Sequence, residues 1–243
     1  MLEAVFISDL HLHPQQQDIC KRFFEFADWM ENQKADLYIL GDFFHAWAGD
    51  DATEQWSDAI AKRLKALSQQ GIKIYFMHGN RDFLVGRHFA NAAGMQLIKE
   101  PYRLKLGGQK IVLAHGDRYC LRDKAHQRFR KLTRNRLFPW LFLKMPLSLR
   151  LKLVSSVRNH SQNNQQKRVS DMDIVPDALT LHIQQLGADA IIHGHIHKYG
   201  FTDHSHHGKL YQQIVLSDWD DSPQILCYDN PKGFYFMQIN SEH

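Results

Sequence analysis

Short apolar runs alternate with helical patterns along the first third of the chain. The runs are rich in β-branched residues, lie beside turn residues, and cover residues 4–7, 37–40 and 72–77. Between the first two, residues 19–30 carry Phe23, Phe26 and Met30 on one stripe, and Ile60, Leu64 and Leu67 repeat this spacing before the third. Runs of this length are typical of strands, and a spacing of three or four is typical of amphipathic helices. The resulting β-α-β-α order predicts an α/β fold.

The second half of the chain changes character twice. Strand-like runs return at residues 111–114 and 190–192, and after Ser217 the segments QILCYD and GFYFMQI flank Asn-Pro-Lys-Gly, which predicts a closing β-hairpin. From Cys120 to about Leu186 no segment has a strand pattern. We therefore predict a helical insertion at residues 120–186, within a core formed by residues 1–119 and 187–243.

Length and composition indicate a soluble globular protein. The chain has 243 residues, of which 44% are hydrophobic and 23% charged, enough to bury a core without cross-links. Its three cysteines are far apart and odd in number, which argues against a disulfide framework and a CxxC zinc site. The N-terminus has no basic region before its apolar run, and no apolar run reaches the roughly 20 residues that span a bilayer. We expect a cytoplasmic protein without a membrane-crossing segment.

Each predicted strand is followed by polar residues that can bind a metal ion. The segments FISDLHLH, YILGD, FMHGNRD, VLAHGD and IIHGHIH supply Asp9, His11, Asp42, Asn80, His115, His195 and His197. Any one of them alone is more often a cap or a turn former. Because the carboxyl ends of parallel strands meet at one edge of a sheet, and alternate residues of an extended segment face the same side, we expect these seven side chains to converge.

These ligand types indicate the metal and the reaction. Oxygen and imidazole nitrogen without thiolate suit manganese, iron or zinc. Seven ligands are too many for one ion and suitable for two ions that share a carboxylate. Two ions roughly 3.5–4 Å apart can acidify a bridging water and neutralise charge on a phosphoryl group. The expected chemistry is therefore phosphoester hydrolysis.

The motifs D-x-H, GD, GNRD, HGD and GHxH, in this order, resemble the calcineurin-like metallophosphoesterase family over nearly the whole chain. The resemblance implies a four-layer α/β/β/α sandwich with a helical lid and two divalent metal ions, for which we expect Mn²⁺. It implies one metal site of Asp9, His11, Asp42 and His197 and a second of Asp42, Asn80, His115 and His195, bridged by Asp42. It further implies catalytic roles for Asn80, Arg81 and His115. His193, His13 and His78 then have structural roles.

A closer likeness lies in GDFFHAWAGDD at residues 41–51, HGNRDFLVGRHFA at residues 78–90 and the basic insertion. These resemble a branch of the family that hydrolyses the diphosphate bond of UDP-2,3-diacylglucosamine in lipid A biosynthesis. By this resemblance, water attacks the α-phosphorus, and UMP and 2,3-diacylglucosamine 1-phosphate are released. The chain differs from the commoner family sequence at His45, Ala48 and Ile196, where glutamate, isoleucine and threonine are usual. None is a predicted ligand, so the differences concern the pocket wall beside His45.

Several residues are candidates for substrate binding. The guanidinium of Arg81, which follows Asn80, can pair with two phosphate oxygens, or alternatively form an ion pair with Asp82. Asp123 either neutralises its basic neighbours or, by the resemblance, binds the sugar. The resemblance assigns substrate contacts to Asn80, Arg81, Asp123, Ser161, Asn164, Lys167 and His195. A one-residue gap leaves Asn163 or Arg168 as alternatives.

The insertion combines positive charge with exposed apolar character. Residues 118–168 contain 14 Lys or Arg and one acid, a net charge of +13, which leaves −9 for the rest of a chain of net charge +4. Within it, RLFPWLFLKMPLSLRLKL at residues 136–153 is broken by two prolines into short helices. This composition favours an amphipathic surface on anionic lipid, and we predict a lid over a lipid-binding chamber. A helical pair that packs on its own domain is the alternative.

The resulting expectation is a monomer, peripheral on the cytoplasmic face of the inner membrane, that acts on an acylated UDP-sugar and binds no nucleic acid. One rival is a dinuclear phosphodiesterase acting on a cyclic nucleotide or nucleic acid, and another is a non-catalytic scaffold, although no ligand is missing. A lipid substrate requires Trp140, Leu141, Phe142 and Leu143 near the pocket. The segment HSHHGK at residues 204–209 is expected to be an exposed turn.

Overall fold

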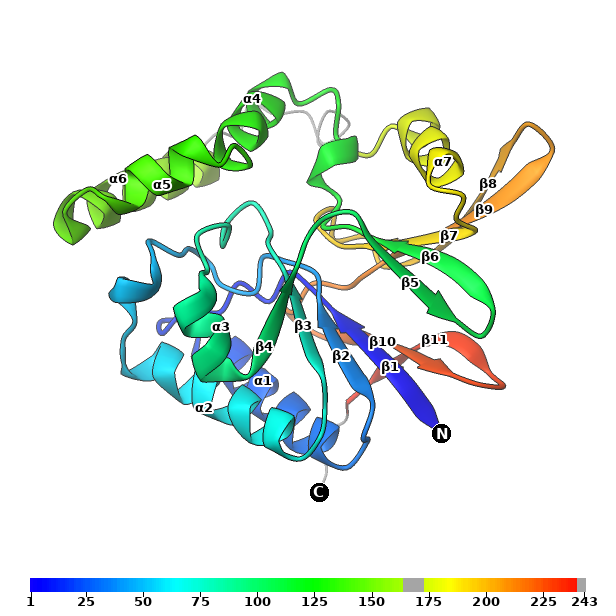
Figure 1. Ribbon diagram of the computed structural model, residues 1–243, viewed down its shortest axis with the longest axis horizontal. Helices are drawn as coiled ribbons and strands as arrows, with labels where there is room; N and C mark the ends of the chain where they lie inside the picture. Colours follow the sequence, from blue (N-terminus) through cyan, green and yellow to red (C-terminus); the bar gives the residue numbers. More distant parts are fainter. Residues whose placement is uncertain (164–172, 240–243) are drawn as a thin grey trace.

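Two β-sheets stack face to face, and helices cover the outer face of each sheet (Figure 1). The structure is a computed structural model that describes residues 1–163 and 173–239. In this part of the chain, the first sheet runs in the order β11 (Gly233–Gln238), β10 (Gln224–Asp229), β1 (Leu2–Ile7), β2 (Asp36–Ile39), β3 (Ile74–Met77) and β4 (Met95–Ile98). The second runs in the order β5 (Tyr102–Leu106), β6 (Gln109–Leu113), β7 (Ala190–His193), β9 (Lys209–Val215) and β8 (Gly200–His206).

The first sheet is built from β-α-β units, as the sequence predicts. Strands β1, β2, β3 and β4 are parallel neighbours. Their connections contain α1 (Gln17–Glu31), the 3₁₀ turn η1 (Asp50–Ala52), α2 (Gln55–Gln69) and α3 (Arg87–Ala93). Strands β10 and β11 form an antiparallel hairpin that pairs with β1, which confirms the predicted closing hairpin.

The second sheet contains strands that the sequence pattern did not indicate. Strands β6, β7 and β9 are parallel, and the antiparallel hairpins β5–β6 and β8–β9 form its edges. Most of β8 is exposed and polar, so it lacks the hydrophobic pattern of a strand and is held by pairing with β9 along its whole length. The predicted turn at residues 204–209 is therefore shorter than expected, because residues 204–206 belong to β8.

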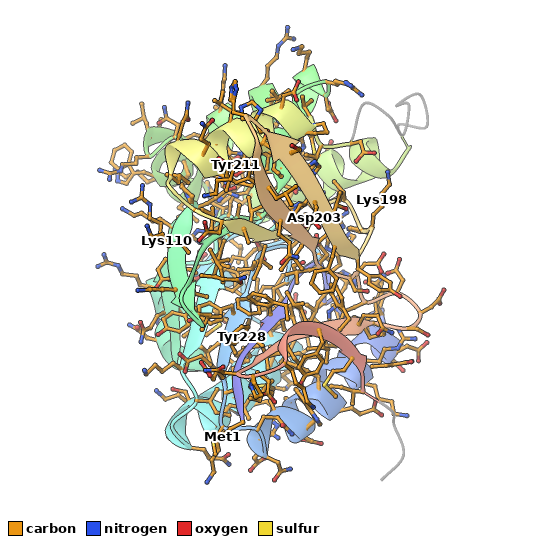
Figure 2. All side chains as sticks on the ribbon, turned by 90° about the vertical axis from the view of Figure 1, so that its right-hand side faces the viewer. Met1, Lys110, Lys198, Asp203, Tyr211 and Tyr228 are labelled. Atoms are coloured by element: carbon orange, nitrogen blue, oxygen red, sulfur yellow. The ribbon has the colours of Figure 1, made fainter. Side chains whose placement is uncertain are left out.

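The alternating side chains of the strands form three separate apolar layers. On β1, Val5 and Ile7 pack with α1 and α2, whereas Ala4 and Phe6 pack between the sheets. On β7, Ile191 faces a third layer formed with helix α7 (Pro176–Gln185), which contributes Leu179 and Ile183. Figure 2 shows these layers edge-on, with α7 above the sheet that carries Tyr211 and the sheet of Tyr228 below it. This arrangement confirms the predicted α/β/β/α sandwich.

Three helices within the predicted insertion lie together over the loops that follow β2 and β3 (Figure 1). After the 3₁₀ turn η2 (Asp117–Tyr119) come α4 (Lys124–Thr133), α5 (Leu137–Leu143) and α6 (Leu147–Asn163). Arg150 of α6 is buried, and its guanidinium donates to the Asp51 carboxylate, to Ala48 O and, over 3.0 Å, to Met145 O. Arg134 donates to His78 O over 2.9 Å. These contacts attach the helices to the loops that carry the predicted site.

Candidate metal centre

The seven predicted ligands follow the carboxyl ends of their strands, as expected. Asp9 and His11 follow β1, Asp42 follows β2, Asn80 follows β3, His115 follows β6, and His195 and His197 follow β7. The first three of these strands belong to one sheet and the last two to the other, so the residues lie where the ends of the two sheets meet. The ligands therefore converge at the carboxyl ends of strands from two sheets, not of one sheet alone.

Six of the seven residues form two compact groups. The potential ligand atoms of Asp9, His11 and His197 lie within 4.8 Å of one another, and so do those of Asp42, His115 and His195. The seventh, Asn80, joins the second group, because its Oδ1 lies 3.0 Å from Nε2 of His115. The first group holds three of the four residues predicted for the first site, and the fourth, Asp42, lies in the second group.

The backbone is strained at most of these positions. Among the residues that the structure describes, seven non-glycine residues have a positive φ, and five of them are predicted ligands: Asp9, His11, Asp42, His195 and His197, with φ between 52° and 74°. A side chain in the left-handed region costs roughly 1–2 kcal/mol per residue. Such strain concentrates at functional sites, where the surrounding structure holds it. The chain therefore turns sharply after β1, β2 and β7, at the positions of these five ligands.

Glycines beside the ligands leave space for the carboxylates. A Cβ on Gly79 would lie 2.1 Å from Oδ1 of Asp42, and a Cβ on Gly194 would lie 2.1 Å from Oδ2 of Asp9. Neither position could carry a side chain without displacing a carboxylate. The glycines of GNRD and GHxH are therefore steric requirements of the site.

The Asp9 carboxylate is oriented by its neighbours and has one oxygen left over. Its Oδ2 accepts hydrogen bonds from Ser8 Oγ at 2.6 Å and from the His195 backbone N–H at 2.8 Å. Its Oδ1 is buried with no hydrogen-bond partner among the described residues, and the same is true of both ring nitrogens of His11. Buried polar atoms without a partner are costly. A cation between these atoms would satisfy them.

Two of the histidines are neutral at neutral pH. Burial, together with the charge of Arg81, lowers the pKa of His11 to about 3. Burial and the charge of His115 likewise lower the pKa of His195 to about 3. Metal ions bind the neutral imidazole, so both rings are in the form that binding requires.

The surroundings of His115 show that the buried carboxylates of the site require a nearby positive charge. Its Nδ1 lies 2.9 Å from Leu40 O and must carry a hydrogen, because a carbonyl only accepts. Its Nε2 faces Asn80 Oδ1 at 3.0 Å and Asp42 Oδ1 at 3.6 Å, both acceptors. Burial lowers the pKa of His115, but Asp42 and the other nearby carboxylates outweigh this effect and raise it to about 9. Without metal a proton balances the carboxylates. A metal ion can replace this proton.

Arg81 contacts Asp42, not Asp82. Its Nε lies 3.3 Å from Asp42 Oδ2, and its backbone N–H donates to Asp42 Oδ1 over 2.9 Å. Asp82 is fully buried and accepts the backbone N–H groups of Gly79 and Phe43, so the alternative Arg81–Asp82 surface pair is absent among the described contacts. Asp82 instead joins the loops after β2 and β3.

Two positioning residues escaped the sequence analysis. Asp82 is one of them, because the motif alone does not show where its carboxylate points. The other is Asp218, whose Oδ2 lies 3.2 Å from Nδ1 of His197 and thereby orients the ring. Metal-binding histidines commonly use their second nitrogen in this way. The only sequence signal for Asp218 is its place in a cluster of acids after Ser217.

The predicted substrate residues are described only in part. Asp123 is the N-cap of α4, and its Oδ1 accepts the backbone N–H of His126 over 2.9 Å. Ser161, Asn164 and Lys167, and the alternatives Asn163 and Arg168, lie outside the residues whose side chains the structure describes. Their contacts with substrate stay a prediction.

The histidines expected to be structural have protein partners. His193 is buried, with Nδ1 2.8 Å from Gly194 O and Nε2 2.9 Å from the Gln213 side-chain amide. Nε2 of His78 lies 2.7 Å from Val85 O. His13 accepts the backbone N–H of Gln15 over 3.3 Å. Of the three alternating histidines in IIHGHIH, only the last two face the ligand groups.

An apolar cavity of about 80 Å³ opens next to the metal ligands. Asn80 and Arg81 belong to its wall, and the rest of the wall consists largely of Trp47, Phe83, Phe129, Phe138, Phe142, Leu153, Val154 and Val157. Of the four residues that a lipid substrate requires near the pocket, Phe142 lines this cavity. Trp140, Leu141 and Leu143 are instead exposed on the outside of α5.

Comparison with known proteins supports the same chemistry. Residues 3–199 match the model of the calcineurin-like phosphoesterase family. The UDP-2,3-diacylglucosamine hydrolase of Pasteurella multocida is 40% identical over 98% of both chains. The protein of the same name from Stutzerimonas stutzeri is 40% identical over 92% of this chain and 93% of its own. A family match over most of the chain, together with relatives of this identity, establishes that the chain belongs to the calcineurin-like phosphoesterase family.

Proposed function

We propose that the protein hydrolyses the diphosphate bond of UDP-2,3-diacylglucosamine in lipid A biosynthesis, releasing UMP and 2,3-diacylglucosamine 1-phosphate. Relatives named for this substrate match the chain at about 40% identity over nearly its full length. The observation that carries the proposal is the apolar cavity beside the ligand groups, which is lined by the predicted ligand Asn80 and by its neighbour Arg81. A diphosphate attached to acyl chains needs a polar and an apolar site in contact.

Two divalent ions, proposed to be Mn²⁺, fit the donor atoms of the site. One would be held by Asp9, His11, Asp42 and His197, and the other by Asp42, Asn80, His115 and His195. The unpartnered Oδ1 of Asp9 and ring nitrogens of His11 support the first site. His115 Nε2, which faces the oxygens of Asn80 and Asp42 where a metal ion can replace its proton, supports the second. When bound, two such ions acidify water and neutralise charge that develops on a phosphoryl group.

Two arginines provide positive charge for the diphosphate. Arg81 keeps one face partly exposed beside Asp42. Arg158 donates to His45 O, and its burial and the nearby charge of Arg81 lower its pKa to about 10, so it remains charged at neutral pH. Two partly buried guanidinium groups repel each other until an anion lies between them. We therefore assign binding of the diphosphate to Arg81 and Arg158, with Arg81 also stabilising the charge that develops during hydrolysis.

We further propose that residues 120–186 contain a lid over a chamber for the acyl chains. The cavity of about 80 Å³ is smaller than an apolar cavity of about 150 Å³ that accommodates benzene, so it cannot hold two acyl chains as it stands. Helices α5 and α6 would have to move away from Trp47 and Phe83 to admit them. The lid is thus proposed to open for the substrate.

The outer face of α5 and α6 is suited to an anionic membrane surface. Leu137, Trp140, Leu141, Leu143, Leu149 and Leu151 each expose 43–60% of their surface. Basic side chains accompany them, and Nζ of Lys144 lies 3.6 Å from the centre of the Trp140 ring. Among the described residues no helix combines the length and apolar character needed to cross a bilayer. We propose peripheral attachment to the cytoplasmic face of the inner membrane as a monomer, without nucleic acid.

The proposed function is tested by measuring release of UMP from UDP-2,3-diacylglucosamine in detergent micelles with Mn²⁺. A deacylated UDP-sugar and bis-p-nitrophenyl phosphate serve as comparison substrates. Rapid cleavage of the acylated substrate alone is expected. The variants Asp42→Ala and His115→Ala should lose this turnover, whereas His88→Ala, at an exposed position on α3, should retain it. Cleavage of only the generic diester would retain the metal centre and overturn the substrate.

A further inference from the structure

A second and larger cavity, of about 460 Å³, adjoins the apolar one. The two share Ala46, Trp47, Val154 and Arg158 in their walls. The rest of the larger cavity is mainly polar and aromatic, with His13, Gln16, His45, Glu54, Trp56 and Ser155. Burying aliphatic chains here would leave polar groups without partners, which is costly. The two cavities are thus suited to different parts of one ligand.

The wall of this cavity is continuous with the metal-binding segments. Leu12 N–H donates to Phe43 O over 2.8 Å, and His45 N–H donates to Leu12 O over 3.1 Å. The two segments therefore run side by side from the ligands His11 and Asp42 to the cavity. His13 and His45 lie two and three residues beyond those ligands, at most about 7–11 Å along an extended chain. A group attached to a phosphate at the metal centre can reach this cavity.

Aromatic rings form one side of the cavity. The centre of the His13 ring lies 5.4 Å from that of His45 and 6.5 Å from that of Trp56. Phe44, which is buried, supports Trp56 from behind at 5.8 Å. Because Nδ1 of His13 accepts the Gln15 N–H, Nε2 is the ring nitrogen that can donate to a ligand. Flat rings with a nearby donor are suited to a nucleobase, since base–aromatic stacking needs only a π-face.

We propose that this cavity is the nucleoside subsite, where the uracil and ribose of the substrate bind against Trp56 and the two histidines. The proposal rests on the function proposed above. It divides the substrate at Arg158, with the nucleoside on one side and the acylated sugar in the apolar cavity on the other. The proposed nucleoside subsite is lined by His45 and Ala48, two positions at which this chain differs from the commoner family sequence.

Two measurements test the subsite. The first is photo-crosslinking of 5-iodo-UMP to the Mn²⁺-loaded wild-type protein, which should label peptides 13–16 or 45–56. The second is product inhibition. Trp56→Ala should raise the inhibition constant of UMP at least about fivefold, the lower range for loss of one base stack. Inhibition by 2,3-diacylglucosamine 1-phosphate should change less than about twofold, as for an independent site.

Controls separate this proposal from the proposed function. Phe201→Ala, which removes an exposed ring on β8, should leave both inhibition constants unchanged. If Trp56→Ala does not fold, Trp56→Phe should retain UMP inhibition and Trp56→Leu should weaken it. Normal turnover with unchanged UMP inhibition in Trp56→Ala, or crosslinks only at the apolar cavity, overturns the subsite alone. A wild-type enzyme that releases no UMP overturns the proposed function.

Discussion

Replacing Gly194 by alanine perturbs the metal centre through a single methyl group. The added Cβ would lie 2.1 Å from Asp9 Oδ2 and 2.2 Å from Ser8 Oγ, far inside van der Waals contact. The φ of Gly194 lies outside the left-handed region, so the backbone itself tolerates alanine. Whatever the substitution costs therefore comes from the displaced carboxylate and hydroxyl.

The cost follows from the contacts that must change. Asp9 Oδ2 accepts two hydrogen bonds, from Ser8 Oγ and from the His195 N–H. Overpacking costs about 1–3 kcal/mol, and each hydrogen bond to a charged group contributes about 1.5–3 kcal/mol. We expect a loss of about 2–3 kcal/mol in the free energy of unfolding, which lowers Tm by roughly 4–12 °C for a chain of this size. Because Asp9 also loses its orientation, Mn²⁺ affinity should fall about 10–100-fold.

Titration calorimetry with Mn²⁺ and thermal unfolding of the metal-free protein measure the two effects separately. Gly187→Ala is the matched control, because its Cβ has nothing within 4 Å and its φ of +62° adds only backbone strain. It should lose about 1–2 kcal/mol and retain the affinity for both ions. If Gly194→Ala bound two Mn²⁺ ions with wild-type affinity, the close approach of Gly194 to Asp9 would have no functional meaning.

Three further predictions concern residues around the site. Asp218→Asn should weaken only the ion bound by His197, by about 10–100-fold, so metal analysis at limiting Mn²⁺ should find one ion per chain instead of two. Arg150→Met should detach α6 and lower kcat/KM for the acylated substrate at least about tenfold, the effect of losing one charged hydrogen bond. Hydrolysis of bis-p-nitrophenyl phosphate by this variant should stay unchanged. The exposed control Lys152→Met should leave both activities unchanged. Burial and the charge of Arg118 lower the pKa of His182 to about 4 from 6.5, so its neutral form favours folding above pH 6.5 and this contribution disappears as the pH falls toward 4. The wild-type protein should lose unfolding free energy between about pH 7.5 and 5, and His182→Gln should reduce this loss by roughly 1 kcal/mol. The effect is this small because solvent screens the half-exposed ring. Equal losses in both proteins would contradict the prediction.

The strand ends were predictable because two local signals agree there. An apolar run that stops at an aspartate or histidine marks both a buried strand and a polar residue at its end. This pattern located β1, β2, β3, β6 and β7 with their ligands. It failed for β4, β5 and β9, and for β8, whose alternation is weak because both faces are largely polar. Such a strand depends on its partner β9, and pairing with a distant segment leaves no local signal.

The positions of Asp82 and Asp218 were not predictable for a different reason. Each acts through one hydrogen bond or ion pair to a residue that lies far away in the sequence, such as Phe43 for Asp82. Neither spacing nor composition encodes such a pair. The same holds for Arg158, which lies 113 residues from its acceptor His45. Residues that bind through periodic elements are visible in the sequence, whereas residues that orient others become visible only in the fold.

The left-handed turns explain why the motifs of this family are so recognisable. Five ligands adopt a conformation that disfavours most side chains, and Asp42 and Asp9 each lie against a glycine where no Cβ fits. Each motif therefore has to supply both a metal ligand and the turn that orients this ligand. Such turns cost roughly 1–2 kcal/mol per residue without returning any packing energy. The three apolar layers must supply that energy, and bound metal would return part of it by neutralising the buried carboxylates. A scaffold without metal would gain nothing from keeping five such turns, so their presence here favours an enzyme.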